Sequence, residues 1–546
     1  MLMSKAVDGD LGALNVAVIG SGLSAVGAIK SLIHRGIRPT VFDWGEQLGS
    51  DREQRVAFLS TKSPEAWTAE ERAWLNDNPT VKGQAAIPRK LAFGSDYFYG
   101  TSMKAAPISG AGNLPPFSYA LGGLSSGWGA AVLPPHACDL ADWPVDAAVL
   151  QKYCEIVLAD LPYSAADDRL SRDFPPLSGA ARPLQLSRAA TRILWALEKA
   201  RVQKPGETVF GQARLLVRAG DERESGCRYC GQCMSGCVYG AIYKAGHDIL
   251  AMAARDEIDY IPRCLIDGLV ENGDRVTVRY FDANEELHTR EFDRVFLAAG
   301  AVNSARIVCN SLALFDEKIE LKSRGGFVLP VFSLWRLPVD WPNCNTQPGL
   351  FLELKGKGLE HWVHVQISTE NELVMKKLGI ASGRTGFVAR IKRFVAEHVF
   401  FLLVNYHSDH AGTYELRVKP AENTAVGANT MHTVQRKAFP QKGVMWASGL
   451  RLLKVFARIA CLPLFPFAKL NSGAYHVGGT LPMKAEKSGP LDTDSLGRVG
   501  SWQRIHVVDT AVFPSLPGTT IGLLAMANAY RIVDNIHWFN QIGAQE

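Results

Sequence analysis

One segment constrains the fold of this 546-residue chain more than any other: residues 15–45, NVAVIGSGLSAVGAIKSLIHRGIRPTVFDWG. Residues 16–19 are β-branched or small and apolar, as in a strand that is buried on both faces. A glycine-containing turn follows, and apolar residues then recur at helical spacing up to Gly36, a residue type that often ends a helix. A second apolar run ends in Asp43. The segment therefore predicts a β-α-β unit.

The turn of this unit has the residue types that a dinucleotide cradle needs. Gly20 permits a tight turn, Gly22 lets a pyrophosphate approach the backbone, and Ala25 lets the helix pack closely on the strand. The free amides at the start of the helix would face the phosphates, and Asp43 stands where a ribose-binding carboxylate belongs. The alternative is a β-α-β unit without a ligand, and the pattern by itself does not distinguish FAD from NAD.

A second strand and helix of the same kind lie far downstream. The segment RVFLAAGAVNSARIVCNS, residues 294–311, reads as a buried strand that runs through Ala299 and Gly300 into a helix. We therefore expect the nucleotide-binding domain to be interrupted in sequence.

Composition limits the class of protein. Hydrophobic content of 47% and charged content of 21% are ordinary for a globular protein, and the length requires more than one core. A net charge of +5 without a dense Lys/Arg tract argues against a nucleic-acid partner. Because the N-terminus lacks the apolar core of a signal peptide, we expect a cytoplasmic protein. The ten Cys then suggest reduced thiols or metal ligands.

Membrane contact is expected only at the surface. No run of 18 apolar residues occurs, so no transmembrane segment is predicted. Two segments mix basic and apolar residues, VMKKLGIASGRTGFVARIKRF (374–394) and LRLLKVFARIACLPLFPFAKL (450–470). They are typical of surface helices packed on a core, or of a peripheral membrane contact.

Two further glycine-rich segments carry a resemblance to a known family. The first is ALGGLSSGWGAAVLPPHACDLADWPVD, residues 120–146. The second is the pair YHVGGTLPM (475–483) and VVDTAVFPSLPGTTIGLLAMANAYRIVD (507–534) near the C-terminus. Together with residues 15–45 and 294–311, they resemble the glucose–methanol–choline oxidoreductases, which are FAD-dependent.

The resemblance implies a set of cofactor contacts. It implies that FAD binds at the turns already named and at the second glycine motif and the C-terminal segment; the residues are Gly20, Gly22, Ala25, Asp43, Gly122, Gly123, Ser125, Ala299, Gly300, Asp509 and Gly518. Some sugar-oxidising relatives carry a His on the second glycine motif that bonds covalently to the flavin. The loop of this chain reads Ser125-Ser126-Gly127-Trp128, with no His, so we expect non-covalent FAD.

The resemblance also implies a catalytic residue. His476 matches the catalytic His of the family, and we expect it to act as general base or to hold the substrate oxygen. The family usually has a second His or an Asn after the final Pro-Gly turn, where this chain has Thr519. A hydroxyl is not a base near pH 7. A redox-neutral reaction therefore stays open beside oxidation.

Four cysteines form a separate motif. Cys227, Cys230, Cys233 and Cys237 have the spacing C-x2-C-x2-C-x3-C, which matches a ferredoxin-type run except that Val238 replaces the usual Pro. An iron–sulfur cluster, a zinc ion, and metal-free thiols or a disulfide are the alternatives. A cluster beside FAD would let electrons leave singly, which favours a dehydrogenase with a protein or quinone acceptor over an oxidase.

The middle of the chain predicts an antiparallel sheet. Strand-like segments are GLFLELKGK, EHWVHVQIS, HVFFLLVNYHS and GTYELRVKP. The expected fold class is therefore α/β, with a discontinuous Rossmann-like FAD-binding domain and an α+β substrate domain whose sheet is mostly antiparallel. We place the first domain at 1–310 and 470–546, with a Cys-rich insert at 225–240, and the second at 311–469.

These features predict an FAD-dependent oxidoreductase that acts on the CH–OH group of a sugar, polyol or other alcohol, with a lean toward carbohydrates. The alternatives are a redox-neutral isomerase or epimerase, and an electron-transfer subunit with flavin and iron–sulfur groups.

Overall fold

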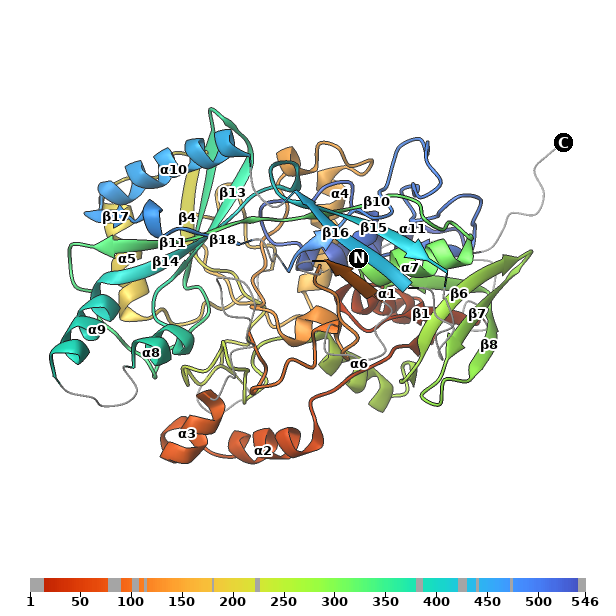
Figure 1. The fold of residues 1–546 in the computed structure, drawn as a ribbon, viewed down its shortest axis with the longest axis horizontal. Helices are drawn as coiled ribbons and strands as arrows, with labels where there is room; N and C mark the ends of the chain where they lie inside the picture. Colours follow the sequence, from red (N-terminus) through yellow and green to blue (C-terminus); the bar gives the residue numbers. More distant parts are fainter. Residues whose placement is uncertain are drawn as a thin grey trace.

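A parallel sheet and an antiparallel sheet occupy opposite ends of the molecule (Figure 1). The computed structural model describes residues 14–76, 90–100, 108–111, 115–178, 181–220, 226–379, 386–420, 430–437, 441–471 and 475–538. Among these residues, no helix combines the length and apolar character that crossing a membrane requires.

The parallel sheet is assembled from distant parts of the chain. Its strand order is β20-β9-β1-β2-β5, and every neighbouring pair is parallel; the strands are β1 (Val16–Ile19), β2 (Thr40–Phe42), β5 (Asp259–Ile261), β9 (Arg294–Leu297) and β20 (Ile505–Val507). β1 and β9 are fully buried, as parallel strands with covered faces must be. This arrangement confirms the expected Rossmann-like, discontinuous domain.

Helices cover the parallel sheet. α1 (Leu23–His34) packs against α11 (Gly522–Asn535), so that a Cβ on Gly27 would meet the Met526 carbonyl oxygen at 2.2 Å. α7 (Ala301–Ser311) follows β9, and its apolar side chains lie in the cluster that includes Ala17 and Val295. The C-terminal helix is thus part of the nucleotide fold.

The antiparallel sheet has the order β17-β11-β14-β13-β12-β4, with β18 also paired to β11. The strands are β4 (Thr208–Gln212), β11 (Gly326–Ser333), β12 (Leu350–Gly356), β13 (Leu359–Ser368), β14 (Val399–Asn405), β17 (Cys461–Pro463) and β18 (Lys469–Asn471). All its pairs are antiparallel, as expected. β4 precedes residue 311, so this sheet takes one strand from outside the range assigned to the second domain.

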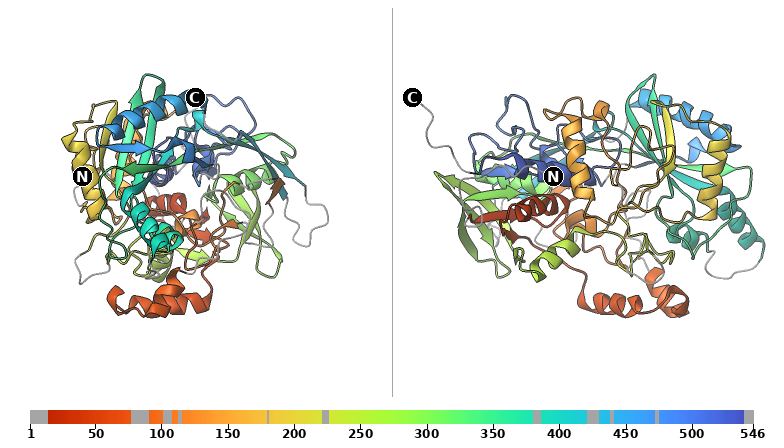
Figure 2. Two further views of the ribbon diagram at one scale, coloured as in Figure 1. Left: turned by 60° about the vertical axis from the view of Figure 1, so that its left-hand side comes forward. Right: turned by 180° about the vertical axis from the view of Figure 1, so that it is seen from behind.

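The two faces of this sheet differ. α5 (Arg188–Lys199) and α10 (Lys442–Ala457) cover the outer face (Figure 2). Phe400 and Tyr406 are fully buried on this face. The other face contributes Phe351 and Trp362 to the cluster that also contains β1 residues. That face is therefore turned toward the nucleotide domain.

A third sheet joins the two parts. Its order is β19-β10-β15-β16-β3; the strands are β3 (Ile108–Ala111), β10 (Ile319–Ser323), β15 (Thr413–Lys419), β16 (Thr430–Lys437) and β19 (Val477–Gly478). A meander of β6 (Leu265–Asn272), β7 (Arg275–Phe281) and β8 (Leu287–Phe292) lies at the nucleotide-domain end. The remaining α-helices are α2 (Ser50–Ser60), α3 (Ala69–Asn76), α4 (Ala147–Leu158), α6 (Ala245–Ala254), α8 (Glu372–Leu378) and α9 (Phe387–His398).

Candidate functional site

The turn after β1 has the shape of a cradle. Gly20 has φ +106°, and a Cβ there would meet the Ala298 carbonyl oxygen at 2.4 Å, so only glycine fits. A Cβ on Gly22 would meet nothing within 4 Å. Gly22 therefore faces open space at the N-terminus of α1, where backbone amides are free to bind an anion.

Asp43 stands at the end of β2 and is tied to this turn. The Ser21 hydroxyl donates a hydrogen bond to its carboxylate and accepts one from the Gly122 amide at 2.9 Å. Burial raises the pKa of Asp43 to about 7, against the opposing effect of the bond from Ser21. Ser21 thus links the first glycine turn, the acidic residue and the second glycine motif.

The second glycine motif lies directly beside the first. A Cβ on Gly123 would stand 3.5 Å from the Gly22 Cα, and Gly122 and Gly123 both have positive φ, +84° and +57°. The Ser125 hydroxyl donates to the Gly122 carbonyl at 2.5 Å and accepts from the Ala245 amide at 3.0 Å. The side chain of Ser125 therefore braces the loop, and its contact with a cofactor stays a prediction.

The third turn is held by Asp509. Its buried carboxylate accepts hydrogen bonds from the Gly300 amide at 2.8 Å, the Ser304 hydroxyl at 2.5 Å and the Ala511 amide at 2.8 Å. Gly300 has φ +85°, and a Cβ there would meet nothing within 4 Å. Open space therefore lies above the ends of β1 and β9, with glycines on both sides, and the residues present fit a dinucleotide such as FAD.

His476 is partly buried just before β19. The Arg324 amide donates to its carbonyl at 3.0 Å, and its Nδ1 has no hydrogen-bond partner among the described residues. Burial, followed by the charges of Arg324 and His364, holds the pKa of the imidazole well below its usual range. The ring is therefore neutral near pH 7, which is the form that accepts a proton.

Arg324 connects His476 to the Pro-Gly turn. Its Nη1 donates to the carbonyl of Gly518 at 3.0 Å and to that of Thr519. Burial lowers the pKa of this guanidinium to about 9, which leaves it charged at neutral pH. The fully buried Thr519 hydroxyl has no partner among the described residues. The structure thus brings together the two residues that we expect to be catalytic.

A row of polar side chains on the antiparallel sheet was missed by sequence reasoning. Glu353, His364 and Asn405 are cross-strand neighbours on β12, β13 and β14, and all are buried. The carboxyl of Glu353 shares a 2.6 Å hydrogen bond with His364 Nδ1, and Gln366 lies 3.1 Å from His364 Nε2. The signal was present in HWVHVQIS, where His364 and Gln366 alternate with apolar residues.

This row lies close to the candidate catalytic residue, because Asn405 pairs with Gly326 of β11, and the amide of Arg324, two residues earlier, is bonded to His476. Burial raises the pKa of Glu353 and lowers that of His364, so the pair has no net charge in either proton arrangement. A neutral polar wall of this kind can bind hydroxyl groups without attracting an ion.

The low pKa of His476 predicts the pH profile of turnover. A histidine near its usual pKa of about 6.5 would lose half its basic form at that pH, and kcat/KM would fall with it. Since His476 titrates well below this range, we expect kcat/KM to change by less than about twofold between pH 8 and pH 6. Steady-state rates across this range check the prediction, and an acid limb near pH 6.5 that is absent from solvent and stability controls would contradict it.

The four motif cysteines line one pocket, together with Asn345 and Gln232. All ten cysteines are free, so the disulfide alternative is not found in the structure. Asn345 Nδ2 donates to the Cys227 sulfur and the Thr346 amide to the Cys233 sulfur, each at 3.4 Å. The described part of the Cys-rich insert begins at residue 226.

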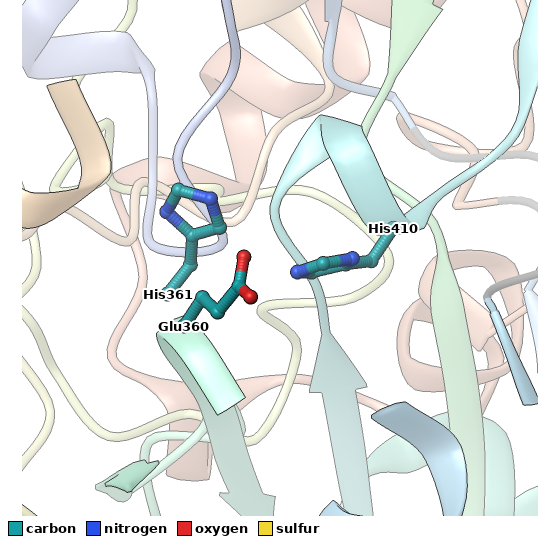
Figure 3. Close-up of side chains that lie close together, drawn as sticks. All are labelled: Glu360, His361 and His410. Atoms are coloured by element: carbon teal, nitrogen blue, oxygen red, sulfur yellow. The ribbon is translucent and has the colours of Figure 1, made fainter. Parts of the chain in front are cut away.

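A second cluster of titratable groups lies behind the Pro-Gly turn. The carboxylate of Glu360 lies between the rings of His361 and His410 (Figure 3). His361 is also stacked on His407, with centroids 3.7 Å apart and planes 9° apart, and Asp409 contacts both rings. One nitrogen of His361 and one of His407 lie 3.5 Å and 3.4 Å from the same carboxylate oxygen of Asp409.

The charge of this cluster follows from its carboxylates. Burial alone would lower the pKa of His361, but Asp139 and Asp409 raise it to about 9. The imidazolium is therefore ion-paired at neutral pH. A Cβ on Gly518 would stand 2.5 Å from the Trp362 carbonyl oxygen and 3.1 Å from the His407 amide, so this cluster supports the Pro-Gly turn from outside.

Comparison with known proteins places the fold. No family model matches the chain, and no curated protein matches its sequence. Among solved structures, pyridoxine 4-oxidase from Mesorbium loti matches with a TM-score of 0.57 and 14% identity, over 97% of this chain and 100% of that one. The chain therefore has the fold of a glucose–methanol–choline oxidoreductase, as its motifs led us to expect.

Proposed function

We propose that this protein is an FAD-dependent oxidoreductase that oxidises a CH–OH group. The observation that carries the proposal is the bridge made by Arg324, which holds His476 and the Gly518–Thr519 turn together. The glycine cradle at the ends of β1 and β9 supports it further. The structural match is, by its name, an oxidase of pyridoxine.

The roles of the residues follow from their chemistry. Bound FAD would supply the acceptor for the hydride that leaves the substrate carbon. The neutral imidazole of His476 would take the hydroxyl proton, so that an alcohol becomes a carbonyl compound. Arg324 keeps its charge and its carbonyl contacts, and it would fix the position of the turn that carries Thr519. The Thr519 hydroxyl, which has no partner among the described residues, would bind a substrate oxygen.

The polar row of Glu353, His364, Gln366 and Asn405 supports a substrate with several hydroxyl groups. An apolar wall would suit a sterol or a simple alcohol, whereas buried polar groups need hydrogen-bonding partners. We therefore place carbohydrates and polyols ahead of the other substrate classes.

Anaerobic reduction of the bound flavin tests this proposal. The purified protein is mixed with a panel of sugars, polyols and simple alcohols, and the flavin absorbance is followed without oxygen. Bleaching by a polyhydroxylated compound, with formation of its carbonyl product, is the expected result. Protein that folds but takes up no FAD would overturn the proposal.

A redox-neutral epimerisation is the second candidate function, because Thr519 stands where a second basic or amide side chain is usual. It predicts steady turnover without any external electron acceptor. The leading proposal predicts one turnover per flavin under the same conditions, so product counted against enzyme separates the two.

The surface of the antiparallel-sheet end supports a membrane-located acceptor. On α9, four side chains on one side of the helix are unusually exposed: Phe387 (77%), Val388 (63%), Ile391 (48%) and Phe394 (50%). The same helix carries three basic residues, Arg390, Lys392 and Arg393. Exposed apolar groups flanked by cations are typical of helices that lie in an anionic membrane surface.

This apolar surface continues onto the edge of the sheet. Phe394 contacts the ring of Phe332, whose cross-strand neighbour is Leu462, and Leu462 and Phe467 are 52% and 66% exposed. Two basic-apolar segments that the sequence places far apart therefore form one surface. We call the exposed residues of α9 with Leu462 and Phe467 the α9 surface.

We expect the protein to sediment with vesicles of phosphatidylcholine and phosphatidylserine, and less with phosphatidylcholine alone. Phe387→Ser should weaken binding about tenfold, since burying a Phe contributes about 1.5–3 kcal/mol. Leu287→Ser is the matched control, because Leu287 is 56% exposed on β8 at the other end of the molecule. Equal loss in both variants, or no binding to either vesicle, would contradict the role of the α9 surface.

A further inference from the structure

The Cys-rich loop forms a site that the alcohol-oxidising machinery does not use. Cys227, Cys230, Cys233 and Cys237 all line one pocket between the loop and the segment around Asn345. Cys230 and Cys233 are buried, and Cys227 and Cys237 are partly buried. A metal centre requires several free thiols around one buried space, whereas the packing of a hydrophobic core does not require this arrangement.

The spacing of the sulfur atoms argues against a single zinc ion. Four thiolates on one zinc ion lie about 3.8 Å apart, the edge of a tetrahedron with Zn–S bonds of about 2.3 Å. In the described part of the chain, no cysteine belongs to a group of three side chains with all ligand atoms within 4.8 Å of one another. No three of the four motif sulfur atoms are therefore that close together. The sulfur atoms are therefore spaced more widely than the four ligands of one zinc ion.

The backbone of the loop is shaped to surround its contents. Tyr229, Gly231 and Gly236 have positive φ of +51°, +70° and +121°. A Cβ on Gly231 would stand 2.5 Å from the carbonyl oxygen of Pro342, and a Cβ on Gly236 would stand 2.8 Å from the ring of Phe93. These tight contacts hold a loop with little regular structure in one conformation.

Hydrogen-bond donors are directed at two of the sulfur atoms in this pocket. N–H groups of Asn345 and Thr346 donate to the sulfurs of Cys227 and Cys233, and such bonds to sulfur tune iron–sulfur clusters.

The loop is joined directly to the cofactor cradle. A few residues after Cys237, the Ala245 amide is bonded to Ser125 in the second glycine motif. A Cβ on Gly122 would stand 2.5 Å from the Gly246 amide, so the two segments are in close contact. The cysteine pocket is thus attached to the loop that borders the open space above Gly22.

We propose that these four cysteines bind a cubane iron–sulfur cluster that carries electrons away from the flavin site. Its binding follows from the pocket alone, and its role as carrier rests on the proposed function. Oxidation of one CH–OH group releases two electrons and two protons; the electrons pass one at a time through the cluster to a quinone, which takes up both electrons and two protons.

Metal and sulfide analysis of the full chain, purified without oxygen, tests this site. We expect about four iron atoms and four sulfides per chain, and an electron paramagnetic resonance signal that appears on reduction with dithionite. Cys230→Ser should lose most of the iron and the signal. Cys461→Ser is the matched control, because Cys461 is a buried cysteine of β17 outside the pocket, and it should keep both.

Three outcomes would overturn the cluster. They are stoichiometric zinc, iron that persists in Cys230→Ser, and no iron after the wild-type protein is incubated anaerobically with ferrous iron and sulfide. The last measurement needs no variant to fold. Flavin is quantified separately from its release by acid, so a protein with iron and no FAD would refute the proposed function while leaving the cluster in place.

Discussion

Replacement of His476 by alanine is expected to slow flavin reduction by substrate about 10²–10⁴-fold, the usual contribution of a general base. The neutral imidazole beside the Arg324 bridge combines a low pKa with a ring nitrogen that has no partner among the described residues. FAD content should not change, because the contacts of His476 are to Arg324 and not to the glycine cradle. Stopped-flow absorbance under anaerobic conditions measures the rate.

Two controls make this result specific. His288→Ala removes a histidine of β8, paired with Asp282, and should leave the rate unchanged. Added imidazole should restore part of the rate of His476→Ala by filling the space and supplying the base. A variant that retains full flavin reduction with substrate would remove His476 from the chemistry.

Replacement of Gly22 by valine is expected to weaken FAD binding about 100-fold or more while the chain still folds. A Cβ on this residue would have no neighbouring atom within 4 Å, so the valine side chain would extend into the open space where a pyrophosphate must approach the backbone. Gly22 has φ −73°, a conformation that valine tolerates, so folding has no intrinsic reason to fail. Titration of the flavin-free protein with FAD, followed by fluorescence quenching, measures the affinity.

Gly49→Val is the matched control. Gly49 also has open space at its Cβ and lies before a helix, α2, with φ −56°. It should bind FAD as the wild type does, and the thermal unfolding of both flavin-free variants should be similar. Wild-type affinity in Gly22→Val would show that the cofactor does not pass over the first glycine turn.

Much of the nucleotide-binding half could be predicted from the sequence, because its features are local. In residues 15–45, the spacing of the apolar residues matches the side-chain periodicity of a strand and of a helix, and these segments form β1, α1 and β2. Gly20 is required by a positive φ within its own turn. His476, Gly518 and the four cysteines were recognisable because their spacing belongs to short segments.

The surroundings of the candidate base were decided by tertiary structure. The alternation in HWVHVQIS indicates which side chains share a face of the strand, but it does not indicate that this face is turned toward the nucleotide domain. Arg324 lies in no sequence motif. Its bonds to Gly518 and Thr519 join segments almost two hundred residues apart. Such contacts depend on how two sheets pack together, and the periodicity of apolar residues within one segment does not predict that packing. The sequence alone therefore determined the cradle and the candidate base, whereas the folded chain decided what surrounds them.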